Sequence, residues 1–416
     1  MRILLKNPSQ IVTVDTRGNN VKRGTEMNQI FPLTGHSIII ENCKIEDIIP
    51  SSSESKYIYD KEIDLSGKVV LPGLVECHTH TAFAGSRANE FRMKLKGMTY
   101  EEIAAMGGGI NSTVSAVRNS TKEELKKLTH KRVDNFIRQG ITSLEIKSGY
   151  GLDFENETKL LEVINEVNRE TDIDIFATYL GAHTFPKEFK SDHRGYIDSI
   201  TKKMIPYLAK EGLATFCDAF CEATAFQAEE VAEIFSAAKE YGLKLKLHSE
   251  QFNNIGGFEI GLRHNVLSID HLEVIKREDI PRLAAHDIVG VLLPGVSFFL
   301  NYSFAPAREI IENNGIVALS TDFNPGSSHI SSLHLIMSLA AIKMKMSVEE
   351  VISAVTINAA KALGINDITG SIEPGKKADF SVYNTDDYSD IIYSVGSNLN
   401  IMTIKNGKII YSDSGD

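Results

Sequence analysis

The stretch Val70-Leu-Pro-Gly-Leu-Val-Glu-Cys-His-Thr-His80 is the most informative part of this chain for its fold. An apolar, β-prone run ends in two histidines, His78 and His80, at positions i and i+2. On a strand, this spacing places both imidazoles on the same face. Two neutral imidazoles that converge from one strand suit a borderline-soft divalent metal such as zinc. A pair of ordinary histidines on a half-buried strand is the alternative that this stretch alone leaves open.

Strand and helix patterns alternate through the middle of the chain. Thr121-Lys-Glu-Glu124 begins an amphipathic stretch with capping chemistry, Gly140 ends it, and Ile141–Ile146 is predicted as the next strand. Further strands are expected at 173–180, 215–219, 243–248, 267–271, 288–293 and 316–322. This alternation implies right-handed βα units and a parallel sheet. Counted from a strand at Val69, about eight units are present, the number that closes a TIM-type (β/α)8 barrel. A doubly wound open sheet is the competing architecture, but no Gly-rich phosphate loop follows the first strand.

Both ends of the chain consist of short β-prone runs separated by polar loops. Ile11–Val14 and His36–Ile40 are examples near the N-terminus, and Asn406-Gly407 between β-prone runs indicates a hairpin near the C-terminus. Neither end has enough apolar residues to form a core alone. We therefore expect residues 1–66 and 373–416 to pair into one composite β-sandwich domain, and residues 67–372 to form the barrel.

Composition bounds the partners and the setting of the protein. A hydrophobic fraction of 42% and a charged fraction of 24% are ordinary for a soluble globular chain of 416 residues. The formal net charge of −11 argues against nucleic-acid or anionic-membrane partners, because both demand a basic surface. Met1–Asn7 lacks the pattern of a signal peptide, and the four cysteines have no disulfide-framework spacing. These observations predict a reducing, cytoplasmic setting and no nucleic-acid or membrane partner.

Several histidines and one aspartate follow the expected strands at the end that forms the mouth of a TIM barrel. They are His78, His80, His183, His248, His271 and Asp322. One such histidine is more often a structural residue than a ligand, but six such groups at one barrel mouth are hard to explain that way. The set His78, His80, His248 and Asp322 offers three nitrogens and one oxygen. It leaves room for a bound water, as a catalytic zinc site requires.

These residues resemble the amidohydrolase superfamily. The resemblance is carried by Pro72–His80, His248, His271, Ser320–Asp322 and Pro374–Asp379, and it covers nearly the whole chain. Within the superfamily, six motifs in order resemble the imidazolonepropionase family. They are His78–Arg87, Gly107–Ile110, Glu145–Gly151, Gly181–His183, His248–Gln251 and Thr321–Ser327. The resemblance implies hydrolysis of the imidazolone ring of 4-imidazolone-5-propanoate to N-formimidoyl-L-glutamate, in histidine degradation.

The resemblance also implies roles for particular residues. One divalent ion, zinc with iron as the alternative, would be held by His78, His80, His248 and Asp322, and would lower the pKa of its water. Asp322 would accept a proton from that water and return it to the leaving ring nitrogen, with His271 as a second catalytic group. Arg87 would bind the substrate propionate as a planar fork. Further substrate contacts are expected from Tyr150, His183, Gln251, Asn324, Gly326 and Ser327. A homodimer fits the family.

Two rival functions and one rival metal arrangement have to be weighed. Aminohydrolases of purine-like or pyrimidine-like bases carry a glutamate three residues after the strand-five histidine, where this chain has Gln251; Glu250 is one position earlier. A non-catalytic scaffold of the same fold would be expected to lose metal ligands. A carbamylated lysine that bridges two metals would belong at the end of the fourth strand, where we place Leu180–His183. We therefore expect one metal, with Tyr150 after the third strand and Lys147 paired to Glu145 at that strand's edge.

Overall fold

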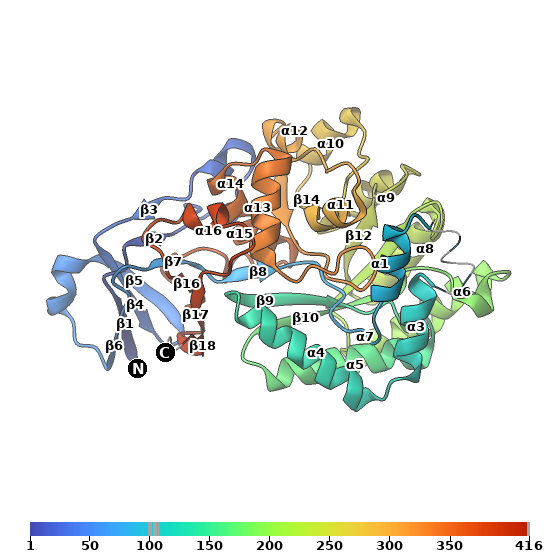
Figure 1. Cartoon of the computed structure of the whole chain (residues 1–416), viewed down its shortest axis with the longest axis horizontal. Coiled ribbons are helices and arrows are strands. Elements are labelled where there is room, and N and C mark those ends of the chain that lie inside the picture. Colours follow the sequence, from blue (N-terminus) through green and yellow to red (C-terminus); the bar gives the residue numbers. More distant parts are fainter. Residues whose placement is uncertain (99–101, 103–105, 107, 414–416) are drawn as a thin grey trace.

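The barrel is the larger part of the computed structural model, which describes residues 1–98, 102, 106 and 108–413 (Figure 1). Its eight parallel strands stand in sequence order in one sheet. They are β8 (Leu74–Glu76), β9 (Ile141–Lys147), β10 (Asp174–Ala182), β11 (Phe216–Cys221), β12 (Lys244–Ser249), β13 (Ser268–His271), β14 (Val289–Leu292) and β15 (Ile316–Leu319). Backbone hydrogen bonds from Asp322 N to His78 O (3.1 Å) and from His80 N to Phe323 O (3.0 Å) join its two ends. The predicted TIM-type barrel is therefore confirmed.

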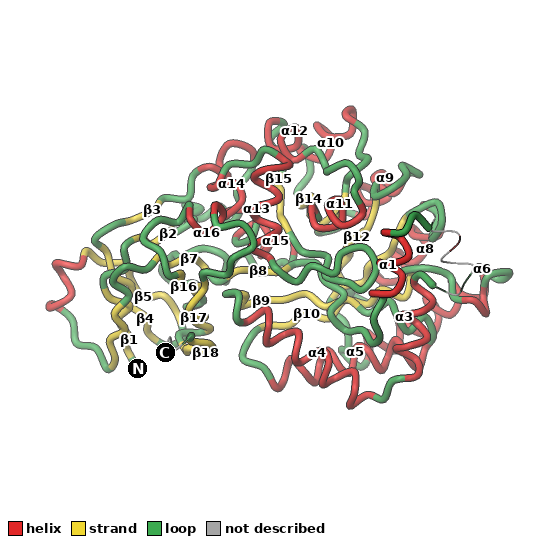
Figure 2. Tube along the Cα trace, viewed as in Figure 1, coloured by secondary structure: helices red, strands yellow, loops and turns green. Residues whose placement is uncertain are grey.

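Helices connect the strands and surround the barrel, as the red segments of Figure 2 show. Before β12 these are α1 (Ala88–Leu95), α3 (Ile110–Asn119), α4 (Lys122–Ile137), α5 (Phe154–Glu170), α6 (His193–Ser199), α7 (Ile205–Lys210) and α8 (Ala228–Glu240). After β12 they are α9 (Gly257–His264), α10 (Ile280–Ala284), α11 (Pro294–Leu300), α12 (Ala307–Glu312), α13 (Leu333–Met344), α14 (Val348–Ala354) and α15 (Ile357–Ala362). The predicted start of α4 is confirmed, because the Thr121 side chain accepts a hydrogen bond from Glu124 N.

The first barrel strand begins later than predicted. The run at Val69 forms β7 (Val69–Pro72), which pairs with β16 (Phe380–Tyr383) and β2 (Gln10–Val12) outside the barrel. Gly73 separates β7 from β8, and a Cβ there would lie 2.3 Å from Thr142 Oγ1, so the chain approaches β9 too closely for any side chain.

The predicted strand numbers were also wrong. The long connection from β8 to β9 carries α1, α3 and α4 and no strand among its described residues, so β9 is the second strand and β10 the third. Tyr150 therefore follows the second strand and His183 the third. The fourth strand is β11, and Glu222 follows it. No lysine stands at this strand end, so the argument against a carbamylated bridging lysine holds at a different position.

The two chain ends form a pair of sheets at one end of the molecule, at the left of Figure 1. One has the order β5-β4-β1-β6 and the other β18-β17-β16-β7-β2-β3. The remaining strands are β1 (Arg2–Lys6), β3 (Pro32–Leu33), β4 (His36–Glu41), β5 (Lys44–Pro50), β6 (Lys61–Asp64), β17 (Asn400–Lys405) and β18 (Lys408–Ser412), and the short helix α16 (Asp390–Tyr393) follows β16. The predicted hairpin joins β17 to β18, with positive φ at Asn406 (51°) and Gly407 (76°).

A buried apolar cluster fills the space between these two sheets. Ile3, Ile38 and Ile40 from the four-stranded sheet belong to the same cluster as Phe380 and Ile404 from the six-stranded sheet. Residues from both ends of the sequence thus share one core, because neither sheet could bury its apolar face alone. Across the described residues, no helix is both long and apolar enough to span a bilayer.

Candidate metal centre and active site

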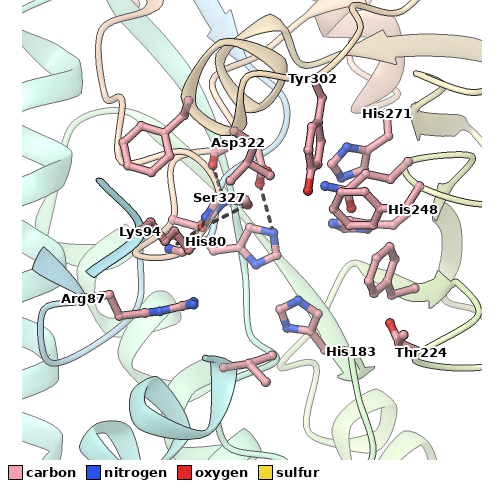
Figure 3. Close-up of a pocket in the computed structure, with 18 of the residues that line it drawn as sticks. His80, Arg87, Lys94, His183, Thr224, His248, His271, Tyr302, Asp322 and Ser327 are labelled. Carbon is pink, nitrogen blue, oxygen red and sulfur yellow. Dashed lines mark hydrogen bonds and ion pairs between the residues drawn. The ribbon is translucent and has the colours of Figure 1, made fainter. Parts of the chain in front are cut away.

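The ends of strands β8, β12 and β15 bring together the four residues predicted to bind metal. The Oδ1 atom of Asp322 lies 3.3 Å from the Nε2 atoms of both His78 and His80. The ring of His248 lies 4.4 Å from that of His78 between centroids. All four side chains are buried. Figure 3 shows His80, His248 and Asp322 facing one another across the mouth of the barrel.

Several polar atoms of this cluster are buried and have no hydrogen-bond partner among the described residues. They are Nε2 of His78, Nε2 of His248, and Oδ1 of Asp322. Buried polar atoms are nearly always paired, and the convergence of these atoms suits a bound ion. Imidazole nitrogens and a carboxylate oxygen at this spacing suit a divalent cation such as zinc. The residues present therefore fit a metal ion.

Carboxylates behind two of the histidines orient their rings. Asp270 Oδ2 lies 2.6 Å from His78 Nδ1, and Asp218 Oδ2 lies 3.0 Å from His248 Nδ1. Each contact directs the Nε2 atom toward the cluster, as metal-binding histidines require. Burial lowers the pKa of His248 well below its ordinary value, which keeps the ring neutral and able to bind a cation. Sequence reasoning missed both aspartates, although a carboxylate inside an apolar strand was the available signal.

A buried ionic network lies beneath these aspartates inside the barrel. Lys147 Nζ lies 2.9 Å from Glu145 Oε1 and 2.8 Å from Asp218 Oδ2, and Lys246 Nζ lies 2.8 Å from Glu145 Oε2. All four side chains are fully buried. The predicted pairing of Glu145 with Lys147 is confirmed. Its predicted place at a strand edge was wrong, because β9 is covered on both sides by β8 and β10 and these side chains point into the barrel.

His271 and Asp322 both lie at strand ends with left-handed backbone conformations, at φ values of 88° and 48°. Such conformations are uncommon outside glycine and often mark functional sites. Burial opposes charge on His271, but the Glu273 carboxylate, 3.4 Å from Nδ1, raises its pKa above the ordinary value. Burial also acts against the Asp322 carboxylate, yet His78 and His80 hold the pKa of Asp322 well below its usual range.

A cavity of about 750 Å³ opens above the cluster and contains every residue predicted to contact substrate. Its lining includes His80, His248, His271 and Asp322 together with Arg87, Tyr150, His183, Gln251, Asn324, Gly326 and Ser327. His183 stacks on His80 with ring centroids 5.3 Å apart, and burial lowers the pKa of His183 to about 3. Its ring is therefore neutral at pH 7. Gly107 of the predicted glycine motif lies outside the described residues.

Gln251, rather than Glu250, faces this cavity. Strand β12 ends at Ser249, and Glu250 has a positive φ of 59°. The Glu250 carboxylate accepts a hydrogen bond from Phe258 N (3.3 Å) in α9, and burial raises its pKa to about 7. The glutamate of the deaminase pattern is thus replaced in the cavity by an amide, which cannot shuttle a proton at neutral pH.

Arg87 is held from two sides. Its Nε donates to Glu90 Oε2 at 2.8 Å, and a Cβ on Gly326 would lie 2.1 Å from its Nη1. Gly326 belongs to a turn in which Asn324 Oδ1 accepts hydrogen bonds from the backbone N–H groups of Gly326 (2.7 Å) and Ser327 (2.8 Å). The loop after β15 therefore forms the surface on which the guanidinium rests.

Comparison with known proteins agrees with this geometry. Residues 95–411 match the amidohydrolase family. The chain is 40% identical over 411 residues to an imidazolonepropionase of Christiangramia forsetii, which covers 99% of this chain and 100% of that one. It is 41% identical over 416 residues to an imidazolonepropionase of Geobacillus thermodenitrificans, and this match covers 99% of this chain and 98% of the relative. Among solved structures, a triazine hydrolase variant has a TM-score of 0.78 at 18% identity, covering 100% and 96% of the two chains. E. coli guanine deaminase has a TM-score of 0.74 at 14% identity (99% and 99%).

The barrel and the histidine–aspartate cluster at its mouth define a metal-dependent hydrolase of the amidohydrolase class. The solved structures are too distant in sequence to show more than this fold. Within that class, the chain belongs to the imidazolonepropionase family.

Proposed function

We propose that this cavity hydrolyses the imidazolone ring of 4-imidazolone-5-propanoate to N-formimidoyl-L-glutamate. In this reaction a water oxygen bonds to the ring carbonyl carbon, the ring C–N bond breaks, and the departing nitrogen gains a proton. The observation that carries the proposal is the presence, in one cavity, of an unpartnered metal-binding cluster and of Arg87. The full-length relatives named imidazolonepropionase support the same substrate.

We propose that His78, His80, His248 and Asp322 hold one divalent ion, zinc with iron as the alternative. When bound, such an ion supplies an acidified water and a positive charge near the substrate carbonyl. A zinc complex of a structurally similar atrazine chlorohydrolase from Arthrobacter aurescens, with a TM-score of 0.76 at 17% identity over 100% and 97% of the chains, is compatible with zinc in this fold.

Proton transfer falls to Asp322. Its carboxylate faces the cavity, and its depressed pKa keeps it ionised at neutral pH, ready to accept a proton from the attacking water. The Asp322 carboxyl group can then return that proton to the departing ring nitrogen. His271, whose pKa is raised, lies where a positive ring can stabilise the negative charge that develops on the carbonyl oxygen.

Other residues that line the cavity would orient the substrate. Arg87 offers Nη atoms that no described residue engages, and these suit the propionate as a bidentate fork. Tyr150 and His183 lie 5.4 Å apart between ring centroids, beside His80, where they can flank the ring. Gln251 and the Asn324–Ser327 turn complete the cavity.

The deciding experiment offers 4-imidazolone-5-propanoate to metal-loaded protein and follows N-formimidoyl-L-glutamate by chromatography. We expect stoichiometric conversion without ammonia release. Guanine and cytosine, offered in parallel, should release no ammonia, because Gln251 cannot act as the proton shuttle. Ammonia from either base, with the imidazolone left intact, would replace this proposal with deamination. Metal analysis of the purified protein separates zinc from iron, and an absence of metal binding would favour a non-catalytic scaffold.

The remaining proposals concern the whole protein. We propose that it acts in the cytoplasm and that it is a homodimer. Sedimentation analysis can test the oligomeric state. We also propose that residues 1–66 and 373–416, together with strand β7, form one domain and that the rest of residues 67–372 form the other. Limited proteolysis near residues 66 and 373 tests that division, since cleavage between domains should leave the barrel fragment intact.

A further inference from the structure

We infer that Lys94 joins Arg87 in a two-cation subsite for the substrate carboxylate. This inference rests on the proposed function and adds a residue to it. Arg87 is the N-cap of α1, and Lys94 lies seven residues later, two helical turns along the same face. Figure 3 shows both side chains on one side of the cavity, with His248 and His271 on the opposite side.

Both cations stand where two cavities meet. Arg87 and Lys94 line the main cavity and also an adjoining side cavity of about 250 Å³. Gly326 and Phe299 line both cavities as well. A ligand whose reacting ring lies at the metal-binding cluster can therefore extend a short anionic chain toward this junction. The propionate group of the proposed substrate is such a chain.

The charges at this junction are not balanced by the residues that the structure describes. Glu90 lies between the two cations along α1, and its carboxylate binds Nε of Arg87 at 2.8 Å. Among residues 1–98, 102, 106 and 108–413, no carboxylate lies within ion-pair distance of Lys94 Nζ. Two cations and one carboxylate leave one positive charge, which one bound carboxylate would neutralise. Partial burial and the nearby Arg87 lower the pKa of Lys94, as expected for an ammonium without a full countercharge.

The two cations would contribute differently. Arg87 is fixed between Glu90 and Gly326, so its planar fork sets the direction of the carboxylate. Lys94 carries a point charge on a flexible stem and can follow the ligand into the side cavity. Lys94 would therefore act on affinity and on preference for an anionic substrate, and it would have no part in bond breaking.

The first test compares Lys94→Met with the control Lys96→Met, which alters an exposed lysine at the end of the same helix. With metal-loaded protein, Lys94→Met should raise KM for 4-imidazolone-5-propanoate by about 5- to 30-fold, within the range of one charge-assisted contact, and should change kcat by less than about twofold. Lys96→Met should change neither quantity. Equal KM values for the parent and Lys94→Met would overturn the subsite.

The second test measures binding without turnover. Calorimetric titration with N-formimidoyl-L-glutamate compares the parent, Lys94→Met, Arg87→Met and the double variant. If both cations hold one carboxylate, the fold loss in affinity of the double variant should differ from the product of the fold losses of the two single variants. If the two fold losses simply multiply in the double variant, Lys94 does not bind the ligand carboxylate that Arg87 binds. This titration also tests the subsite if the parent protein fails to open the ring, so failure of the proposed reaction and failure of the subsite give different results.

Discussion

Asp322 is buried, its carboxylate is ionised at neutral pH and faces the cavity, and its backbone is left-handed with φ of 48°. Asparagine also tolerates that conformation, so Asp322→Asn should keep the fold. Because an amide cannot accept the proton of water, we expect kcat to fall by about 10³-fold or more. Steady-state kinetics and thermal melting check both statements. A loss below about tenfold would indicate another base, with His271 the first candidate.

His78 is fully buried and its Nε2 has no hydrogen-bond partner among the described residues. We expect His78→Ala to lower bound metal and to abolish activity, because removing one of few ligands disrupts the coordination geometry. Metal analysis after purification measures the effect. His130→Ala, on the partly exposed surface of α4, is the matched control and should retain metal. Normal metal content and full activity in His78→Ala would remove this residue from the site.

Gly326 controls the position of Arg87. A Cβ at residue 326 would lie 2.1 Å from Arg87 Nη1, at the flexible end of a side chain, so Gly326→Ala should fold normally and displace the guanidinium. We expect KM for imidazolone propionate to rise by about tenfold, with unchanged metal content, as one charge-assisted hydrogen bond is weakened. The control is Ser66→Ala on an exposed turn, which should leave KM unchanged. Another glycine such as Gly375 is unsuitable as a control, because its positive φ would strain an alanine. An unchanged KM would mean that Arg87 can bind from another rotamer.

At the scale of elements, the loop after β12 is held by the residue that follows β11. The buried Glu222 carboxylate accepts hydrogen bonds from Phe252 N (3.0 Å), Asn253 N (3.1 Å) and Asn253 Nδ2 (2.7 Å). This loop begins with Gln251, so the contact between two neighbouring connections positions a residue of the cavity. Barrel loops of this kind vary in sequence while the strands beneath them stay fixed.

We therefore expect Glu222→Gln to loosen this loop, because an amide presents one acceptor where the carboxylate has two. The free energy of unfolding should fall by about 1–3 kcal/mol, and KM should rise more than kcat falls. Thermal melting and steady-state kinetics measure these effects, and Glu240→Gln, at the exposed end of α8, is the control. A destabilised variant with parental KM would show that the loop does not position Gln251.

At the scale of the whole molecule, an ion cluster joins the barrel to the sheets built from the chain ends. Asp174 at the start of β10 lies 2.7 Å from Lys405 Nζ and 2.9 Å from Lys377 Nζ, and Lys405 also contacts Asp379 at 2.8 Å. Burial acts to raise the pKa of Asp174, but Lys405 and Lys377 outweigh it and hold that pKa below its ordinary value. The cluster thus couples the two parts of the chain electrostatically.

Asp174→Asn should destabilise the protein by about 1 kcal/mol at neutral pH. A carboxylate with a depressed folded pKa stabilises the protein above its unfolded pKa and loses that effect as pH falls through the folded pKa. The difference in unfolding free energy between parent and variant should therefore be constant above about pH 5 and shrink below about pH 4. Denaturant unfolding at several pH values measures it. The control Asp172→Asn removes an exposed ion pair with Lys408 and should change the unfolding free energy little. A difference for Asp174→Asn that does not vary with pH would show that the ionised Asp174 carboxylate is not the source of the stabilisation.

Much of the fold and of the site could be predicted because the signals are local. The capping residue Thr121, the hairpin at Asn406-Gly407 and the alternation of strands with helices each depend on neighbours in sequence. The residues His78, His80, His248 and Asp322 could be grouped because parallel barrel strands all end at the same mouth, so strand position alone places them together. Arg87 and Gln251, which line the cavity, were predicted from family resemblance.

Tertiary structure alone decided which strand opens the barrel and what supports the residues predicted to bind metal. Val69–Pro72 and Leu74–Glu76 are equally apolar, and only pairing with β16 assigns the first of them to the terminal sheets. Asp218, Asp270 and Lys246 lie in separate strands, so their contacts beneath the histidines follow from barrel closure and not from any motif. Lys94 looks like an ordinary surface residue in sequence, and only the packing of α1 beside the cavity shows its position. Sequence determines what is local or periodic, whereas contacts between distant segments exist only after the chain has closed.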